Sequence, residues 1–271
     1  LATTTRDLKQ IVPDICKGWE LSDDYKEITI YLRKGMRWPD GAPLTTEDVR
    51  FWYEDVLLNE ELTPTFPNTW APGGEPMKVI IDDDYTFRMK FAVPYPVVID
   101  LLPNLYPFYP KHYIKQFHIK YNDKADELAK KEGYEFWWEA FQAHSIGDAN
   151  QFDTDYPLLR PWVLESVDAS QNRSYVRNPY YWRVDTKGNQ LPYIDWWDRT
   201  WLEDTEVLNA QAIAGQADIH GWYLKRDNYP LFKENEEKGG YRTILYPDAR
   251  ASDYGFAFNY THKDPVLRNI F

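Results

Sequence analysis

The chain of 271 residues is long enough for one large or two medium-sized domains, and its 43% hydrophobic content supports a sizeable buried core. A net charge of −12 argues against a surface that binds nucleic acid, and the single cysteine, Cys16, excludes an intrachain disulfide. No stretch approaches the ~18 consecutive apolar residues needed to cross a membrane. Twelve Trp and 21 Tyr exceed what a core needs, so we expect most to be packing residues and some to line a recognition surface.

The strongest local signals lie between residues 28 and 57. Apolar residues alternate with polar ones from 28 to 32, which predicts a half-buried strand. The sequence Pro-Asp-Gly at 39–41 then predicts a turn. A helix is predicted directly afterwards, with Thr45 or Thr46 as its N-cap, because acidic residues follow and apolar residues then recur at helical spacing.

The rest of the first half predicts short elements joined by loops. Residues 63–76 are rich in Pro, Gly and Thr and predict a long loop, a type of segment that often binds ligands. A hairpin is predicted over 77–91 and a helix over 97–102. Residues 123–141 are charged and helical in pattern, with an interruption at Gly133.

The second half has a different pattern. Polar and turn residues cluster at 145–157, where we place a domain boundary. A helix is predicted from Asp204 or Thr205 through Ala214, ended by Gly215. Strands are predicted at 162–167, 174–177, 195–201, 217–219 and 255–259. Strand, helix and strand with short connections are typical of a βαβ unit and thus of an α/β domain.

Four segments also carry a family resemblance. Residues 32–49, LRKGMRWPDGAPLTTEDV, resemble the signature L-R-x-G-x-x-[FW]-x-D-G-x-P-x-T-x-x-D-V of the family 5 extracellular solute-binding proteins. Segments 13–24, 176–183 and 210–219 resemble further elements of this family, and they occur in the family's order. The residues that fall on the signature are Arg33, Gly35, Trp38, Asp40, Gly41, Pro43, Thr45, Asp48 and Val49.

The resemblance implies a mixed α/β and α+β fold of the type II periplasmic-binding-protein kind. Residues 1–153 then correspond to the family's accessory α+β domain, and residues 154–271 to part of one α/β lobe. The second lobe, which closes over the ligand in family members, has no counterpart in these residues. Family members are the peptide-binding components of ABC importers, and relatives take peptides, nickel, opines or oligosaccharides.

No arrangement of residues in the sequence indicates catalysis or metal binding. There is no nucleophile elbow, no glycine-rich phosphate loop and no H-E-x-x-H motif. The five histidines are scattered, which favours surface or core roles over metal ligation. We therefore expect neither a cofactor nor a metal.

The favoured ligand-binding residues are His220, Gly221, Trp222 and Tyr223, because they follow a predicted strand whose carboxyl end is where open α/β sheets place ligands. Gly221 would let a ligand approach the backbone, and Trp222 would stack on it. The alternative is a buried Trp that closes the end of the sheet. Trp70, in the long loop, is a weaker candidate because a loop aromatic can simply anchor its loop.

The leading hypothesis is a binding protein that captures a peptide, oligosaccharide or other small polar solute and delivers it to a membrane permease. The resemblance adds Asn259 to the ligand-binding residues and implies a monomer, periplasmic or at the cell surface, whose signal or lipoprotein segment lies outside these residues. The alternative is a carbohydrate-active enzyme or carbohydrate-binding module, suggested by the same richness in Trp and acidic residues. It lacks an identifiable pair of catalytic carboxylates.

Overall fold

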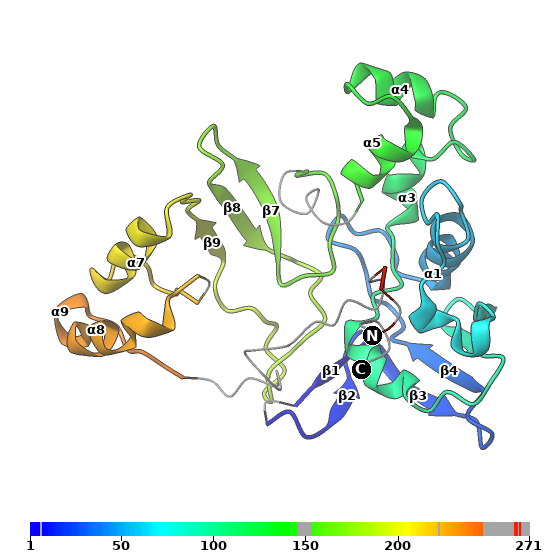
Figure 1. Cartoon of the computed structure of the whole chain (residues 1–271), viewed down its shortest axis with the longest axis horizontal. Helices are drawn as coiled ribbons and strands as arrows, with labels where there is room; N and C mark the ends of the chain where they lie inside the picture. Colours follow the sequence, from blue (N-terminus) through cyan, green and yellow to red (C-terminus); the bar gives the residue numbers. More distant parts are fainter. Residues whose placement is uncertain (6, 146–152, 222, 246–262, 265, 267–271) are drawn as a thin grey trace. The chain divides into compact units, whose positions relative to one another are not determined.

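A computed structural model describes the chain except for residues 6, 146–152, 222, 246–262, 265 and 267–271. Contacts divide it into two compact units, Leu1–Trp201 and Leu202–Phe271 (Figure 1). None of the helices in these described parts is both long enough and apolar enough to cross a membrane.

The first unit contains two antiparallel sheets in its first hundred residues. Strands β1 (Ala2–Thr4) and β2 (Ile11–Pro13) form a two-stranded sheet. The four-stranded sheet has the order β3-β4-β6-β5, with bounds Cys16–Leu21, Glu27–Leu32, Thr86–Lys90 and Lys78–Asp83. In β4 the predicted alternation of buried and partly exposed side chains is present, since Ile28, Ile30 and Leu32 are all buried. The predicted strand and hairpin are thereby confirmed.

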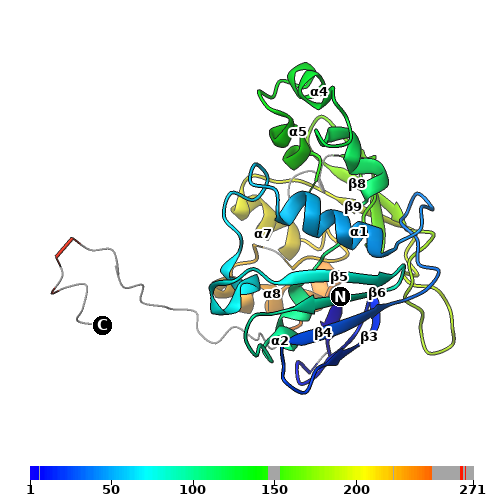
Figure 2. The ribbon, with the colours of Figure 1, turned by 90° about the vertical axis from the view of Figure 1, so that its right-hand side faces the viewer.

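Short helices follow and separate these strands in the sequence, and α1 packs beside β5 (Figure 2). The α-helices are α1 (Thr46–Phe51), α2 (Val98–Leu101), α3 (Lys111–Ile114), α4 (Ala125–Lys131) and α5 (Trp137–Ala143). The 3-10 turns are η2 (Asn68–Trp70), η3 (Pro72–Gly74), η4 (Leu102–Asn104) and η5 (Lys115–Phe117). The helix predicted over 123–141 is thus interrupted around Gly133, as expected, between α4 and α5.

Helix α1 begins as predicted but continues in an unexpected form. Thr45 is its N-cap and forms a capping box with Asp48. From Trp52 to Leu57 the chain forms a π-helix, η1. Nothing in the apolar spacing distinguishes this rare geometry from an α-helix.

The signature segment 32–49 is held together by the carboxylate of Asp48. One carboxylate oxygen accepts hydrogen bonds from the indole Nε1 of Trp38 and the backbone N–H of Thr45, both at 3.2 Å. The other accepts from the backbone N–H of Lys111 at 3.3 Å. Burial raises the pKa of Asp48 to about 6 against these hydrogen bonds. The contacts made by Trp38, Thr45 and Asp48 are therefore structural.

The turn at 39–41 also contacts a second family segment. Gly41 has φ +90°, and a Cβ placed on it would lie 3.3 Å from the hydroxyl oxygen of Tyr180. Glycine at this position thus provides both the left-handed backbone and the space that the Tyr180 side chain occupies.

A three-stranded antiparallel sheet completes the first unit. Its order is β7-β8-β9, with bounds Trp162–Val167, Arg173–Arg177 and Trp196–Arg199. The three strands lie where the sequence predicts them. Their pairing is antiparallel. The βαβ unit predicted from 195 to 219 is not formed within the described residues, because 217–219 is not a strand.

Asp14 connects this later part of the chain to the beginning. Its carboxylate accepts from the Trp182 indole at 3.2 Å and from two nitrogens of the Arg183 guanidinium at 2.9 and 2.6 Å. Its backbone carbonyl accepts from Nε of Arg33 at 2.8 Å. Three of the four family segments therefore meet at one residue.

The second unit is helical where it is described. It contains α7 (Thr205–Ile213), η6 (Arg226–Asn228), α8 (Tyr229–Glu234) and α9 (Glu236–Gly239). The helix α7 and its glycine terminator are confirmed, since Gly215 has φ +68°. A Cβ on Gly215 would collide with the carbonyl of Gly239, so this glycine lets α7 and α9 approach closely.

The strand predicted at 217–219 is not formed. These residues have no regular structure, and Ile219 is 81% exposed. A strand requires a neighbour for its ladder hydrogen bonds, and no described strand pairs with this segment. The strand predicted at 255–259 lies outside the described residues.

His144 connects two acidic residues of the first unit. Its Nδ1 lies 2.8 Å from Asp153 and its Nε2 lies 2.8 Å from Glu132. The hydrogen bond to Asp153 is the main reason that the pKa of His144 is raised. Burial works to raise the pKa of Asp153, but hydrogen bonds from His144 and Tyr113 outweigh it and hold that pKa below its ordinary value.

We expect Asp14→Asn to lower the free energy of unfolding by about 1 to 2 kcal/mol, because it removes the negative charge that pairs with Arg183. Chemical denaturation followed by Trp fluorescence measures this. The matched control is Asp195→Asn, which makes the same charge change at an exposed pair with Arg177 and should cost less than about 0.5 kcal/mol. Equal effects of the two variants would contradict the role of Asp14.

We expect the stability difference between wild type and His144→Gln to depend on pH. The folded protein raises the pKa of His144, so its contribution is complete below about pH 6.5 and is lost as the pH rises through the raised value. Wild type should thus lose stability relative to the variant as the pH rises above about 6.5, a change that chemical denaturation at each pH measures. The lowered pKa of Asp153 gives a second loss in acid, below about pH 4. Parallel pH profiles of the two proteins would exclude this role.

Candidate ligand-binding site

The predicted ligand-binding residues are divided between the two units. His220, Gly221 and Tyr223 belong to the second unit, in the segment that follows α7. Trp70 belongs to the first. Trp222 and Asn259 lie outside the described residues.

Helix α7 provides the scaffold of the segment that follows it. Asp204 caps the helix by accepting a hydrogen bond from the backbone N–H of Glu206 at 2.7 Å. The helix presents Asn209, which is only 2% exposed. A buried Asn inside a helix is unfavourable unless its amide is fully paired, so its partners explain its presence.

Asn209 fixes the chain just beyond the candidate ligand-binding residues. Its Nδ2 donates to the carbonyls of Thr205 at 2.5 Å and Tyr223 at 3.3 Å. Its Oδ1 accepts from the backbone N–H of Lys225 and from the side-chain amide of Asn228, both at 3.2 Å. Sequence reasoning missed this residue; its one signal was a polar residue of poor helix propensity in the middle of α7.

Two features of the 220–223 segment are suited to binding. The Nε2 atom of His220 is buried and has no hydrogen-bond partner in the described structure, so a ligand hydroxyl or carbonyl could satisfy it. Tyr223 is 73% exposed and adopts φ +58°, a backbone conformation that is strained for Tyr and that is often retained at functional sites. Gly221, between them, is exposed.

Trp70 lies in the turn η2 within the predicted loop. Its backbone N–H donates to the carbonyl of Pro67 at 2.9 Å, and its carbonyl accepts from the N–H of Met77 at 2.8 Å. Its side chain is partly buried against the core. These contacts attach the loop to the core of the first unit.

The candidate residues around His220 can contact a ligand through hydrogen bonds and aromatic stacking. Across the described ranges, no group of three or more His, Cys, Asp and Glu side chains is placed to hold a metal ion. The segment around His220 supplies an imidazole, an exposed backbone at glycine and an exposed phenol. Groups of this kind form hydrogen bonds and stacking contacts with a polar solute.

Comparison with known proteins gives a consistent picture. The family model described as "Bacterial extracellular solute-binding proteins, family 5 Middle" matches residues 10–270. The chain is 30% identical over 217 residues to the periplasmic alpha-galactoside-binding protein of Rhizobium meliloti (strain 1021), covering 77% of this chain and 28% of that protein.

Solved structures agree with the family match. An oligopeptide-binding protein OppA matches with a TM-score of 0.84 at 32% identity, over 100% of this chain and 43% of the other. The periplasmic binding protein MelB of Agrobacterium fabrum C58, in complex with stachyose, matches with a TM-score of 0.68 at 26% identity, over 86% of this chain and 34% of the other. The chain thus spans less than half the length of these relatives.

We expect Asn209→Ala to loosen the segment after Tyr223 without unfolding the protein. The amide of Lys225, which donates to Asn209, should exchange with deuterium at least about fivefold faster, because a hydrogen bond worth about 1 kcal/mol is lost. Hydrogen exchange followed by NMR measures this. The control is Asn235→Ala, whose side chain bonds only the carbonyl of Leu231 in the same unit. Unchanged Lys225 exchange in the Asn209 variant would contradict the assignment.

Proposed function

Since this chain belongs to the bacterial extracellular solute-binding proteins of family 5, we propose that it forms the solute-capturing part of an ABC importer. The observation that carries the proposal is the family match over residues 10–270. Members of this family are binding components and not enzymes. We therefore propose a role in binding and none in catalysis.

The proposed ligand is an oligosaccharide that carries an α-galactoside. The alpha-galactoside-binding relative and the stachyose complex of MelB support this class. The 12 Trp residues also suit it, because aromatic rings offer rigid faces on which a sugar ring can pack. An oligopeptide is the second candidate, supported by the similarity to OppA along the entire chain.

The residues proposed to contact the ligand in the second unit are His220, Gly221, Trp222 and Tyr223. The buried, unpaired Nε2 of His220 supports this assignment, since a ligand hydroxyl would supply the missing partner. We retain Trp70 and Asn259 as further proposed contacts.

The remaining proposals concern the complete protein. Residues 1–153 would form an accessory domain and residues 154–271 part of one lobe, with ligand closing that lobe against another. The protein would act as a monomer in the periplasm or at the cell surface, with an export signal or a lipid anchor, and deliver its ligand to a membrane permease.

The test is binding of raffinose, an α-galactoside, and of the tripeptide Ala-Ala-Ala, each followed by saturation-transfer NMR on the 271-residue chain. A complete site with a Kd of ~1 μM corresponds to about −8 kcal/mol, so half of its contacts should give a Kd of ~1 mM. We expect millimolar binding of raffinose and weaker binding of the tripeptide.

His220→Phe should weaken raffinose binding about fivefold, because it keeps a ring but removes the hydrogen-bonding nitrogen. His112→Phe, in the first unit, is the matched control and should leave the affinity unchanged. Tripeptide binding in place of raffinose would favour the second candidate. Binding of neither at tens of millimolar, or turnover of a chromogenic glycoside, would contradict the proposed function.

A further inference from the structure

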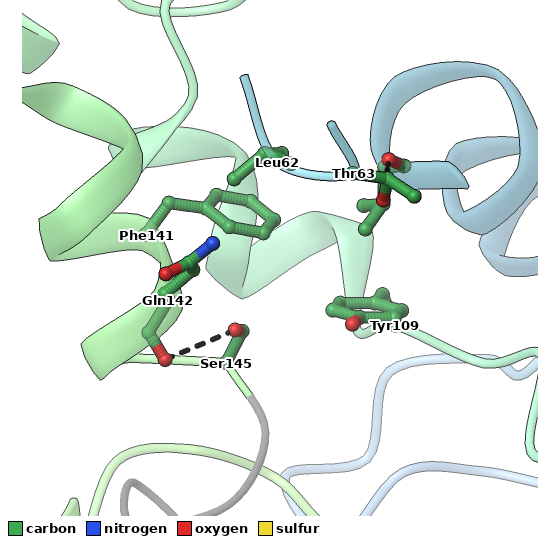
Figure 3. Close-up of a pocket in the computed structure, with 7 residues that line it drawn as sticks. Leu62, Thr63, Tyr109, Phe141, Gln142 and Ser145 are labelled. Atoms are coloured by element: carbon green, nitrogen blue, oxygen red, sulfur yellow. Dashed lines mark hydrogen bonds between the residues drawn. The ribbon is translucent and has the colours of Figure 1, made fainter. Parts of the chain in front are cut away.

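The first unit contains a pocket that the proposed function does not use. Its volume is about 320 Å³, which lies at the lower end of the range for sites that bind small molecules. The lining side chains surround a common space (Figure 3) and are those of Val56, Leu62, Thr63, Tyr109, Phe141, Gln142 and Ser145.

One wall of the pocket is aromatic and well supported. The ring of Tyr109 stacks on that of Phe141, with centroids 6.2 Å apart and an interplanar angle of 19°. Phe51 packs against both rings, at 6.4 Å and 6.3 Å. All three residues are buried, so this wall keeps its shape without a ligand.

Another part of the lining belongs to the π-helix η1 and the turn that follows it. The carbonyl of Val56, in η1, accepts a hydrogen bond from the Thr63 hydroxyl at 2.8 Å. The side chain of Asn59 accepts from the backbone N–H groups of Glu61 and Leu62, at 2.9 and 3.0 Å. The turn is therefore fixed in place, and π-helical geometry is frequently retained beside functional sites.

Unpaired polar groups remain in this pocket. The hydroxyl of Tyr109, a residue 8% exposed, and the side-chain amide of Gln142, an exposed residue, belong to the lining and form no hydrogen bond within the described part of the chain. The Ser145 hydroxyl donates to the carbonyl of Gln142 at 3.2 Å and keeps its own acceptor capacity. A ligand that enters the pocket could exchange water for hydrogen bonds to these groups.

The chemistry of the lining selects a ligand class. None of the lining side chains carries a charge, so a charged ligand would lose its hydration without gaining a counter-charge. A purely apolar ligand would leave Tyr109 and Gln142 unpaired. We propose that this pocket is a second binding site, separate from the solute site, for a neutral molecule with one six-membered ring and an amide or hydroxyl group.

The test uses benzamide as the probe and benzoate, its charged counterpart of nearly the same shape, as the ligand control. For a ligand of nine heavy atoms we expect a Kd of ~0.5 mM. In an NMR titration of the 271-residue chain, we expect benzamide to shift the amides of Phe141, Gln142 and Ser145. Benzoate should bind at least about tenfold more weakly.

Two variants test the pocket itself. Tyr109→Phe should weaken benzamide binding about fivefold, because it removes only the hydroxyl. Gln142→Trp, at an exposed position on the rim, should abolish binding by filling the space. The control is Tyr95→Phe, which removes a hydroxyl that bonds the carbonyl of Thr69 away from the pocket.

Several outcomes would overturn the proposal. These are equal affinities for benzamide and benzoate, an unchanged affinity in Tyr109→Phe, or amide shifts confined to residues outside the pocket. Raffinose should not displace benzamide. Because the probe, the variants and the mapped amides differ from those of the raffinose experiment, failure of either proposal leaves the other standing.

Discussion

A single partly buried carboxylate, that of Asp14, constrains the first unit, because it joins segments 169 residues apart in the sequence. Two nitrogens of Arg183 and the indole of Trp182 donate hydrogen bonds to this carboxylate. The backbone carbonyl of Asp14 accepts a further hydrogen bond from the Arg33 side chain. Charge-assisted hydrogen bonds with paired geometry are strong and directional. The three-stranded sheet therefore lies in the same compact unit as the N-terminal sheets.

Local chemistry explains why part of this fold could be predicted from the sequence. The alternation in β4 and the N-cap at Thr45 depend on residues within a few positions of one another. The pairing of Asp14 with Trp182 and the contact of Asp48 with Lys111 could not be predicted, since each joins distant segments. Three residues of the family signature, Trp38, Thr45 and Asp48, hydrogen-bond with one another. Their contacts are local in sequence, which is why the signature is recognisable as one segment.

Prediction was less successful where a strand depends on its neighbour. Residues 217–219 alternate apolar and polar side chains, but a sequence pattern cannot supply a pairing partner, and the segment is irregular. The candidate site shows a similar division. His220 and Tyr223 could be proposed from the sequence. Asn209, which positions the chain beside them, could not, because its role depends on four hydrogen bonds that only the structure shows.

The contact between Gly41 and Tyr180 has an evolutionary consequence. Since a Cβ at position 41 would lie 3.3 Å from the phenol oxygen at position 180, a replacement requires the ring to shift by a few tenths of an ångström, and the backbone at φ +90° opposes replacement in any case. A smaller side chain at position 180 would remove this contact but not the backbone strain. Glycine is therefore expected to persist at position 41 even in relatives that have lost the phenol.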